Sequence, residues 1–264
     1  MPIYTDLADE LYGPERGRVP EGVRVSRRRV GGTAFTRVLI RREGLARPQG
    51  RYVTAEVDLT DPAARPGAAL QGALAGEIRA LLPAEGLILV VGVGNRRVTA
   101  DALGPRAAGQ VLVTRGLAPE GERWLRQVAS IAPGVAGRTG VPLEQLVQSL
   151  IARLRPAAVL CIDSLAAADP ARLGRTVQLS DAGLWAGRPA GGRGLTPQAL
   201  GVPVLALGIP TMMDAAALAG VPGLVLTPRD LDGVIRRGAA LLAGAVNQAL
   251  QPRLTLDELD YLVS

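Results

Sequence analysis

Two of the twenty amino acids do not occur in this 264-residue chain. It contains no histidine, and all 30 of its basic residues are arginine, so it contains no lysine. The missing histidine excludes Ser-His-Asp and Cys-His catalysis and any zinc site with a histidine ligand. The missing lysine excludes a Schiff base, a Ser-Lys pair and the lysine of a phosphate-binding loop. Carboxylates are therefore the groups left for proton transfer.

Cysteine and aromatic residues are scarce. Cys161 is the one cysteine, and it lies inside the apolar stretch Ala157 to Ile162, where we expect a buried core residue rather than a nucleophile. A single cysteine cannot form an intramolecular disulfide, which fits a reducing compartment. The two Trp, four Tyr and one Phe argue against base-stacking surfaces and aromatic cages.

Long apolar runs are missing as well. No stretch of about 18 uninterrupted apolar residues occurs, as a membrane-spanning helix would need. Residues Met1 to Glu10 include acids where an export signal has a basic and then an apolar region. We therefore expect a cytoplasmic protein with no membrane contact.

The net charge of +6 and the pI near 10.5 suggest a nucleic-acid partner, with Arg27, Arg28 and Arg29 as the densest cluster. Arginine is nevertheless spread along the whole chain, and its complete replacement of lysine favours a compositional bias. We expect no direct binding of nucleic acid, although the net positive charge would still attract an acidic or DNA-associated protein partner.

The chain divides into a β-rich extension, residues 1–66, and an α/β domain, residues 67–264, which we expect to pack as one unit. Apolar spacing predicts helices over Ala68 to Leu82, Pro142 to Leu154 and Arg229 to Ala249. The last of these has Thr227 as its expected cap and Pro228 at its first position. Short apolar runs predict strands over Val23 to Val25, Ala34 to Ile40, Arg51 to Val57, Leu87 to Val93, Gln110 to Thr114, Ala157 to Ile162, Thr176 to Leu179 and Pro203 to Ile209.

Strands that alternate with helices predict an α/β fold with a doubly wound, mostly parallel sheet flanked by helices. Such sheets bind ligands beyond the carboxyl ends of their strands. Polar residues follow four of the predicted strands at this position: Asn95 and Asp101, Asp163, Asp181 and Asp214. Each aspartate alone fits a helix cap or a turn equally well, but together they favour a functional site.

Asp101 and Asp163 are the candidates for chemistry. Thr99 is expected to cap a helix and to leave Asp101 near its positive end, which favours an ionised carboxylate. Asp163 leaves a buried strand, where desolvation raises the pKa of a carboxyl. Two carboxylates of unequal pKa can divide the roles of general base and general acid in hydrolysis, or bind a metal through oxygen.

Two glycine-rich segments are candidates for substrate contact. In Gly92-Val93-Gly94-Asn95 the third glycine of a dinucleotide fingerprint would fall at Arg97, so nicotinamide binding is not expected. Gly94 and Asn95 are expected either to contact a bound group or to form a turn. The loop Ser130 to Gly140, with Pro133, Gly134 and Thr139, is expected to line a cleft or to be a connector. Gly183 to Gly194 is a lid or a surface loop.

Several longer motifs carry a resemblance to a known family. They span nearly the whole chain, in family order: Tyr4-Thr5-Asp6-Leu7-Ala8, Gly50 to Glu56, Val90 to Pro105, Val113-Thr114-Arg115, Ser130 to Gly140, Ile162 to Ala166, Gln178 to Gly183, Gly201 to Asp214 and, more loosely, Leu226 to Ala249. With these segments the sequence resembles the germination protease family of spore-forming bacteria.

The resemblance implies an α/β fold related to the hydrogenase-maturating endopeptidases, synthesis as an inactive precursor, and a homotetramer in the spore core. It implies an atypical aspartic endopeptidase that degrades small acid-soluble spore proteins, without a cofactor. The family's two catalytic aspartates fall on Asp101 and Asp163. The lack of histidine favours a carboxylate pair without a metal.

The chain also departs from the family pattern. Only four residues precede Thr5, where the family has a prosegment, so a processing step is not expected as the timing switch. A family segment between Asp214 and Thr227 is largely missing, and Trp185 follows the Asp181 turn where the family usually has histidine. The main hypothesis is therefore proteolysis, and the alternative is a degenerate member that binds spore proteins or another partner without cleaving them.

Overall fold

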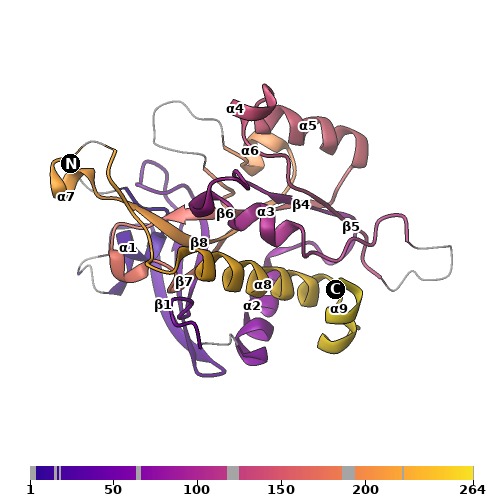
Figure 1. Cartoon of the computed structure of the whole chain (residues 1–264), viewed down its shortest axis with the longest axis horizontal. Helices are drawn as coiled ribbons and strands as arrows, with labels where there is room; N and C mark the ends of the chain where they lie inside the picture. The colour runs from indigo at the N-terminus through magenta and orange to yellow at the C-terminus, as the bar shows by residue number, and fades with distance from the viewer. Residues whose placement is uncertain are drawn as a thin grey trace.

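The computed structural model describes residues 4–14, 17, 19–63, 67–117, 125–185, 194–221 and 223–263. Its centre is a sheet with the strand order β1-β2-β3-β7-β8-β6-β4-β5, and β9 pairs with β8 outside this path (Figure 1). The strands are β1 (Val23–Val30), β2 (Thr33–Ile40), β3 (Gly50–Glu56), β4 (Ile88–Gly92), β5 (Val128–Ile131), β6 (Ala158–Ala166), β7 (Thr176–Ser180), β8 (Val204–Asp214) and β9 (Val225–Leu226).

The sheet has a parallel part and an antiparallel part. Strands β8, β6, β4 and β5 run parallel to their neighbours in that order, while β1, β2, β3 and β7 pair antiparallel, as β7 does with β8. All five residues of β4 are buried, as the continuous apolar run predicts for a strand covered on both faces. The predicted α/β sheet flanked by helices is confirmed, but among the described strands it is mixed rather than mostly parallel, with three parallel and five antiparallel pairings, because the N-terminal strands and β7 join it antiparallel.

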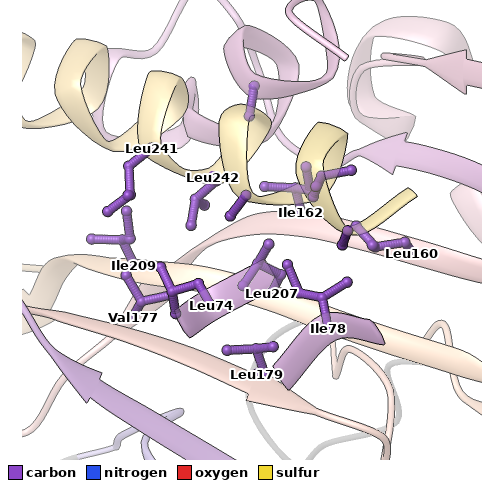
Figure 2. Close-up of a cluster of buried hydrophobic side chains, with 14 of the residues drawn as sticks. Leu74, Ile78, Leu160, Ile162, Val177, Leu179, Leu207, Ile209, Leu241 and Leu242 are labelled. Atoms are coloured by element: carbon purple, nitrogen blue, oxygen red, sulfur yellow. The ribbon is translucent and has the colours of Figure 1, made fainter. Parts of the chain in front are cut away.

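Helices cover one face with a large apolar core. Here α2 (Ala68–Leu81), α3 (Leu103–Ala108) and α8 (Leu231–Leu250) pack on one another and on the central strands. Figure 2 shows Leu74 and Ile78 of α2 and Leu241 and Leu242 of α8 meeting the inward side chains of the strands, among them Ile162. Burial of these side chains is the main source of stability on this face.

The opposite face carries smaller helices and the N-terminal segment. These elements are α1 (Ala8–Tyr12), α4 (Ala136–Thr139), α5 (Leu143–Leu154) and α6 (Pro197–Leu200), with the 3-10 turn η3 (Pro170–Arg172) beside them (Figure 1). Val147 of α5 and Leu7 of the N-terminal segment are fully buried against the alternate side chains of β4 and β6, including Cys161. Cys161 is thus a core residue, as expected from its apolar flanks.

One predicted strand is wrong, and one observed strand is not predicted. Gln110 to Thr114 is not a strand. The Leu112 N–H donates to Oδ1 of Asn247 in α8 at 2.8 Å, so a helix side chain rather than a neighbouring strand is its hydrogen-bond partner. The strand next to β4 is β5, and its last two residues, Ser130 and Ile131, fall within the predicted loop Ser130 to Gly140. Its half-buried position at the sheet edge explains why it lacks a continuous apolar pattern.

The end of the chain also differs from expectation. Helix α8 begins at Leu231 rather than Arg229, because the Asp230 side chain accepts the Gly233 N–H at 3.1 Å and caps it in place of Thr227. A short helix α9 (Leu256–Val263) follows, and α7 (Ala216–Ala219) precedes β9. None of the helices in the described ranges combines the length and the apolar character of a membrane span.

Hydrogen bonds between β3 and β7 join the N-terminal hairpin strands to the central sheet. The proposed division between residues 66 and 67 stays a prediction, and residues 64–66 lie outside the described ranges. The sheet itself runs across that division without a break, from β1 to β5.

Glycine substitutions test the packing of α3 on the strand ends. A Cβ at Gly104 would lie 2.2 Å from the Ile162 carbonyl oxygen and 2.3 Å from that of Val93, whereas a Cβ at Gly76, on the exposed side of α2, would meet no atom within 4 Å. We expect Gly104→Ala to lower the free energy of unfolding by about 1–3 kcal/mol and Gly76→Ala to raise it by about 0.5–1 kcal/mol. Urea unfolding followed by circular dichroism measures both, and equal effects would contradict this packing.

Candidate active site

Asp163 lies within β6, three residues before its end, rather than just after the strand. Its neighbour in β8 is Gly208, whose missing side chain leaves room: a Cβ there would lie 2.5 Å from the Asp163 carbonyl oxygen. Oδ1 of Asp163 accepts the N–H of Ser164 at 2.8 Å. The local sequence thus places a carboxyl on the face of the sheet that also buries Cys161.

Asp101 comes from the turn that follows β4. It ends the 3-10 turn η2 (Thr99–Asp101), and its Oδ2 accepts the backbone N–H of Asn95 at 2.7 Å. The expected Thr99 cap is wrong, because η2 has no side-chain cap. The turn packs against β6 and β8, and Oγ1 of Thr211 in β8 donates to the Ala100 carbonyl at 2.7 Å. These contacts hold Asp101 next to the strand that carries Asp163.

Gly94 makes this turn possible. Its φ of +117° lies in a region that favours glycine, and a Cβ would lie 2.1 Å from the Asp101 carbonyl oxygen and 2.9 Å from Oδ1. The space above Gly94 is therefore filled by Asp101. Asn95, half-buried, uses its own Oδ1 to accept the Arg97 N–H at 3.1 Å. Both residues belong to the site as the support of Asp101.

Burial is the largest influence on the charge of each carboxyl, and both residues keep partial exposure to solvent. Burial raises the pKa of Asp163 well above its ordinary value, and the negative charge of Asp101 raises it further, against the opposing effect of the Ser164 N–H. Burial also raises the pKa of Asp101, against the opposing N–H of Asn95. The prediction for Asp163 is confirmed in direction, but the expectation that a helix end keeps Asp101 readily ionised is wrong.

The structure does not bring Asp181 to this place. Because β7 runs antiparallel to β8, its end points to the opposite edge of the sheet from the ends of β4 and β6. There Asp181 accepts the Arg51 backbone N–H at 2.6 Å and pairs with Nε of Arg51 at 2.9 Å. A strand-end rule that assumes parallel strands fails for this residue.

Asp214 lies at the correct edge but farther out. It is the last residue of β8, where it pairs with Val225 of β9 and accepts the Ala216 N–H at 3.0 Å. Strand β8 continues six residues beyond Gly208, the neighbour of Asp163. Asp214 thus lies on the arm that β8 and β9 form rather than beside the two carboxyls.

The loop after β5 lies at the same edge, one strand beyond β4. Pro133 and Gly134 are half-buried, Gly134 with a φ of +81°. Thr139 ends the single turn α4, and its Oγ1 donates to the Val135 and Val141 carbonyls. The predicted lid falls mostly on residues 186–193, outside the described ranges, while Leu184 pairs with Leu195 across its base.

Asp6 is a neighbour of the site that sequence reasoning quoted only within a motif. Its charge adds to the rise in the pKa of Asp163, and its Oδ2 accepts the Ala166 N–H at the end of β6. A contact between residues so far apart leaves no local pattern in the sequence. Within the described residues, no three histidine, cysteine, aspartate or glutamate side chains gather as a metal centre requires.

Comparison with known proteins supports a family assignment. The family model described as germination protease matches residues 9–221. The germination protease of Clostridium perfringens strain SM101 is 31% identical over 324 residues, covering 99% of both chains, and that of Caldanaerobacter subterraneus is 32% identical over 323 residues, covering 99% of this chain and 98% of the relative. The Bacillus cereus B4264 protein is 35% identical over 236 residues, 82% of this chain and 64% of the relative.

The first two alignments run over more positions than this chain has residues, so those relatives carry segments that it lacks. Among solved structures, the [NiFe] hydrogenase maturation protease HycI from Thermococcus kodakarensis aligns with a TM-score of 0.42 and 17% identity, covering 64% of this chain and 98% of that one. The family model spans well over half of the chain. The chain therefore belongs to the germination protease family.

Proposed function

We propose that this chain is an endopeptidase of spore germination that hydrolyses small acid-soluble spore proteins with water activated by Asp101 and Asp163. One observation carries the proposal: the turn η2, which bears Asp101, packs against β6, which bears Asp163, and the charge of Asp101 adds to the rise in the pKa of Asp163. Pairs of titratable groups whose surroundings separate their pKa values are typical of acid–base catalysis. Family membership supplies the reaction class.

The two environments assign different roles to the carboxyls. Asp163 is the stronger candidate to keep its proton, because burial and a neighbouring charge both oppose its ionisation. Asp101 faces burial alone and has the Asn95 N–H to stabilise its charge, so it is the candidate for the ionised base. The pair then holds one proton between two carboxyls, as a general acid and a general base require.

The proposed reaction uses both groups in sequence. Asp101 takes a proton from water as the water oxygen attacks the peptide carbonyl carbon. Asp163 gives its proton to the departing amine nitrogen when the carbon–nitrogen bond breaks. Transfer of the proton from Asp101 to solvent and uptake of one by Asp163 restore the starting state. Pro133 and Gly134, at the same sheet edge, are candidates to bind the substrate backbone.

The proposal extends to the setting of the enzyme. We place it in the spore core, and we assign it a homotetramer and a regulated, inactive precursor state, all by family resemblance. The finding that supports the setting is the naming of the curated relatives as germination proteases.

Loss of either carboxyl tests the chemistry. We expect wild type to cut a purified small acid-soluble spore protein at a few defined sites, and Asp101→Asn and Asp163→Asn each to lower the rate by about 10²–10⁴-fold, because each removes one proton-transfer group. Intact-mass spectrometry of timed samples measures the products. Asp232→Asn, on an exposed side chain of α8, is the matched control and should cleave at the wild-type rate.

Wild-type cleavage by Asp163→Asn would overturn the mechanism. A further sample contains wild type and a chelator. Loss of activity in that sample would mean that a metal site, rather than the carboxylate pair alone, activates the water. If the substrate stays intact with every variant but co-elutes with the protein, the degenerate, binding-only alternative holds instead.

The same substitution has an opposite effect on stability. A carboxyl whose pKa is raised by folding stabilises the folded state while protonated and loses that contribution as the pH rises through the folded pKa. Asp163→Asn removes the ionisation and keeps an oxygen for the Ser164 N–H. We therefore expect Asp163→Asn to have a larger free energy of unfolding than wild type at neutral pH. We expect no such gain below about pH 4, where the Asp163 carboxyl is protonated in both folded and unfolded wild type. Urea unfolding at the two pH values measures this, and a loss of stability at neutral pH would contradict it.

A further inference from the structure

The arginine cluster Arg27-Arg28-Arg29 lies in β1, which forms one edge of the sheet. Side chains of a strand alternate between its two faces, so Arg24 and Arg28 lie on one face and Arg27 and Arg29 on the other. The face of Arg24 and Arg28 is the one that α2 covers, since Arg28 pairs with Glu77 of that helix. The cluster is therefore divided between the two faces of an edge strand rather than gathered on one.

A groove with a volume of about 350 Å³ lies between this face of the N-terminal strands and the end of α2. Because Arg24 and Ser26 belong to β1, the groove extends to the edge of the sheet. A ligand in it would contact both apolar side chains and positive charges. The lining residues that matter here are Leu39, Val53, Leu81, Arg24, Arg37 and Arg51.

One carboxylate beside the groove pairs with two cations. Glu77 is buried and pairs with both Arg28 and Arg37, with the latter at 2.8 Å. Burial lowers the pKa of the Arg37 guanidinium, and the positive charges of Arg28 and Arg51 lower it further. Arg51 has a carboxylate partner of its own, Asp181, at 2.9 Å. The charges of these arginines are thus only partly compensated.

Arg24 is the unpaired cation of the groove. It is exposed, and it forms no ion pair within the part of the chain that the structure describes. Four guanidiniums on this face, those of Arg24, Arg28, Arg37 and Arg51, therefore meet two carboxylates, and two positive charges remain. Such an excess of positive charge attracts an anionic ligand.

The outer side of β1 has no partner strand among the described residues. The Gly22 carbonyl accepts the Arg41 N–H at 2.8 Å, and this contact sets the alternation of hydrogen bonds between β1 and β2. By this alternation Val25, Arg27 and Arg29 turn their backbone N–H and C=O groups away from the sheet. An edge of this kind can accept a further strand from a partner.

The side chains of β1 determine which partner this edge accepts. In a second copy of this chain arginine would face arginine, because four of the eight residues of β1 are arginine, and like charges on paired strands are destabilising. For a nucleic acid, the described walls of the groove offer no exposed ring on which a base could stack, because Tyr52 is only 4% exposed. An extended peptide with acidic side chains meets neither obstacle.

We propose that the edge of β1 and this groove bind an extended acidic segment of a partner protein. The segment adds to β1 as a further strand, and its carboxylates lie beside Arg24 at the mouth of the groove. Four strands separate β1 from β6, a distance of about 24 Å at the usual strand spacing. The surface is therefore distinct from the site of Asp101 and Asp163, and the inference does not rest on the proposed reaction.

Fluorescence anisotropy tests the charge of the surface. The probe is a labelled octapeptide in which glutamate and threonine alternate, with its intact mass checked after each titration, and a lysine–threonine peptide is its counterpart of opposite charge. We expect the full chain to bind the acidic peptide alone, and Arg24→Glu to weaken this binding about tenfold. Arg153→Glu, on an exposed side chain of α5, changes the net charge equally and should bind as wild type does.

A second pair of variants tests strand addition. Arg27→Pro removes an outward N–H, whereas Arg27→Ala removes the same side chain but keeps that N–H. Proline is tolerated on an edge strand where its nitrogen faces solvent, so we expect both variants to fold, which circular dichroism checks. Arg27→Pro should bind the acidic peptide several-fold more weakly than Arg27→Ala, because one hydrogen bond to the added strand is lost.

If Arg27→Pro does not fold, two modified peptides take its place with the wild-type chain. One is N-methylated at its glutamates and the other at its threonines. A strand that pairs along one edge uses the N–H groups of alternate residues, so only one of these peptides should bind like the unmodified probe. Equal binding by both, or by Arg27→Pro and Arg27→Ala, would overturn strand addition and with it the inference.

Three further outcomes would overturn the inference. Equal weakening by Arg24→Glu and Arg153→Glu would mean attraction to the net charge alone. Tighter binding of an octanucleotide than of the peptide would assign the surface to nucleic acid, and loss of an oligomer in Arg24→Glu, seen by sedimentation, would assign it to a second copy. An absence of binding by wild type would leave these arginines only the role of protecting the edge from aggregation. Because the readouts do not use cleavage, failure of the proposed reaction in the Asp163→Asn test would leave these results unchanged.

Discussion

Ionisation of both Asp101 and Asp163 costs free energy in the folded protein, because burial opposes the charge of each and the charge of Asp101 opposes the ionisation of Asp163. Each has a single backbone N–H to stabilise its charge, from Asn95 and from Ser164. The cost is a property of the folded state alone, since an unfolded chain hydrates both groups. The fold must therefore be stable enough to hold a pair that works against it, as active sites often do.

The remaining structure supplies that stability in two ways. A large apolar core of α2, α8 and the strands lies on the face opposite Asp163. Close to the site, packing depends instead on glycines that let backbone meet backbone: Gly92 against Gly104, Gly94 against Asp101, and Gly208 against Asp163. Side chains at these positions would separate the strand ends and the turn, so the positions of the carboxyls depend on the absence of side chains around them.

The sequence was sufficient to find the carboxyl pair, and the reason is local. Continuous apolar runs mark β4 and β6 as buried parallel strands, and parallel strands end at the same edge, so Asp101 after β4 and Asp163 near the end of β6 come to the same edge. The same rule misplaced Asp181, because the direction of β7 depends on the strands it pairs with and not on its own residues. Edge strand β5 was missed because it is defined by its pairing with β4 and not by an apolar pattern of its own. The start of α8 was misplaced because a single side chain, that of Asp230, caps the helix.

The composition of the chain gives the site a simple response to pH. Arginine stays charged at any pH at which a protein is folded, and histidine and lysine do not occur, so no cationic side chain titrates near neutrality. Burial raises the pKa of the Cys161 thiol, which keeps it neutral there as well. A change in activity between pH 5 and 8 therefore points to carboxyls whose pKa the fold has raised. Asp163 and Asp101 are two such groups. In this chain the burial of the two carboxyls and the charge of Asp101 beside Asp163, rather than a histidine or a lysine, set the pH at which the site changes state.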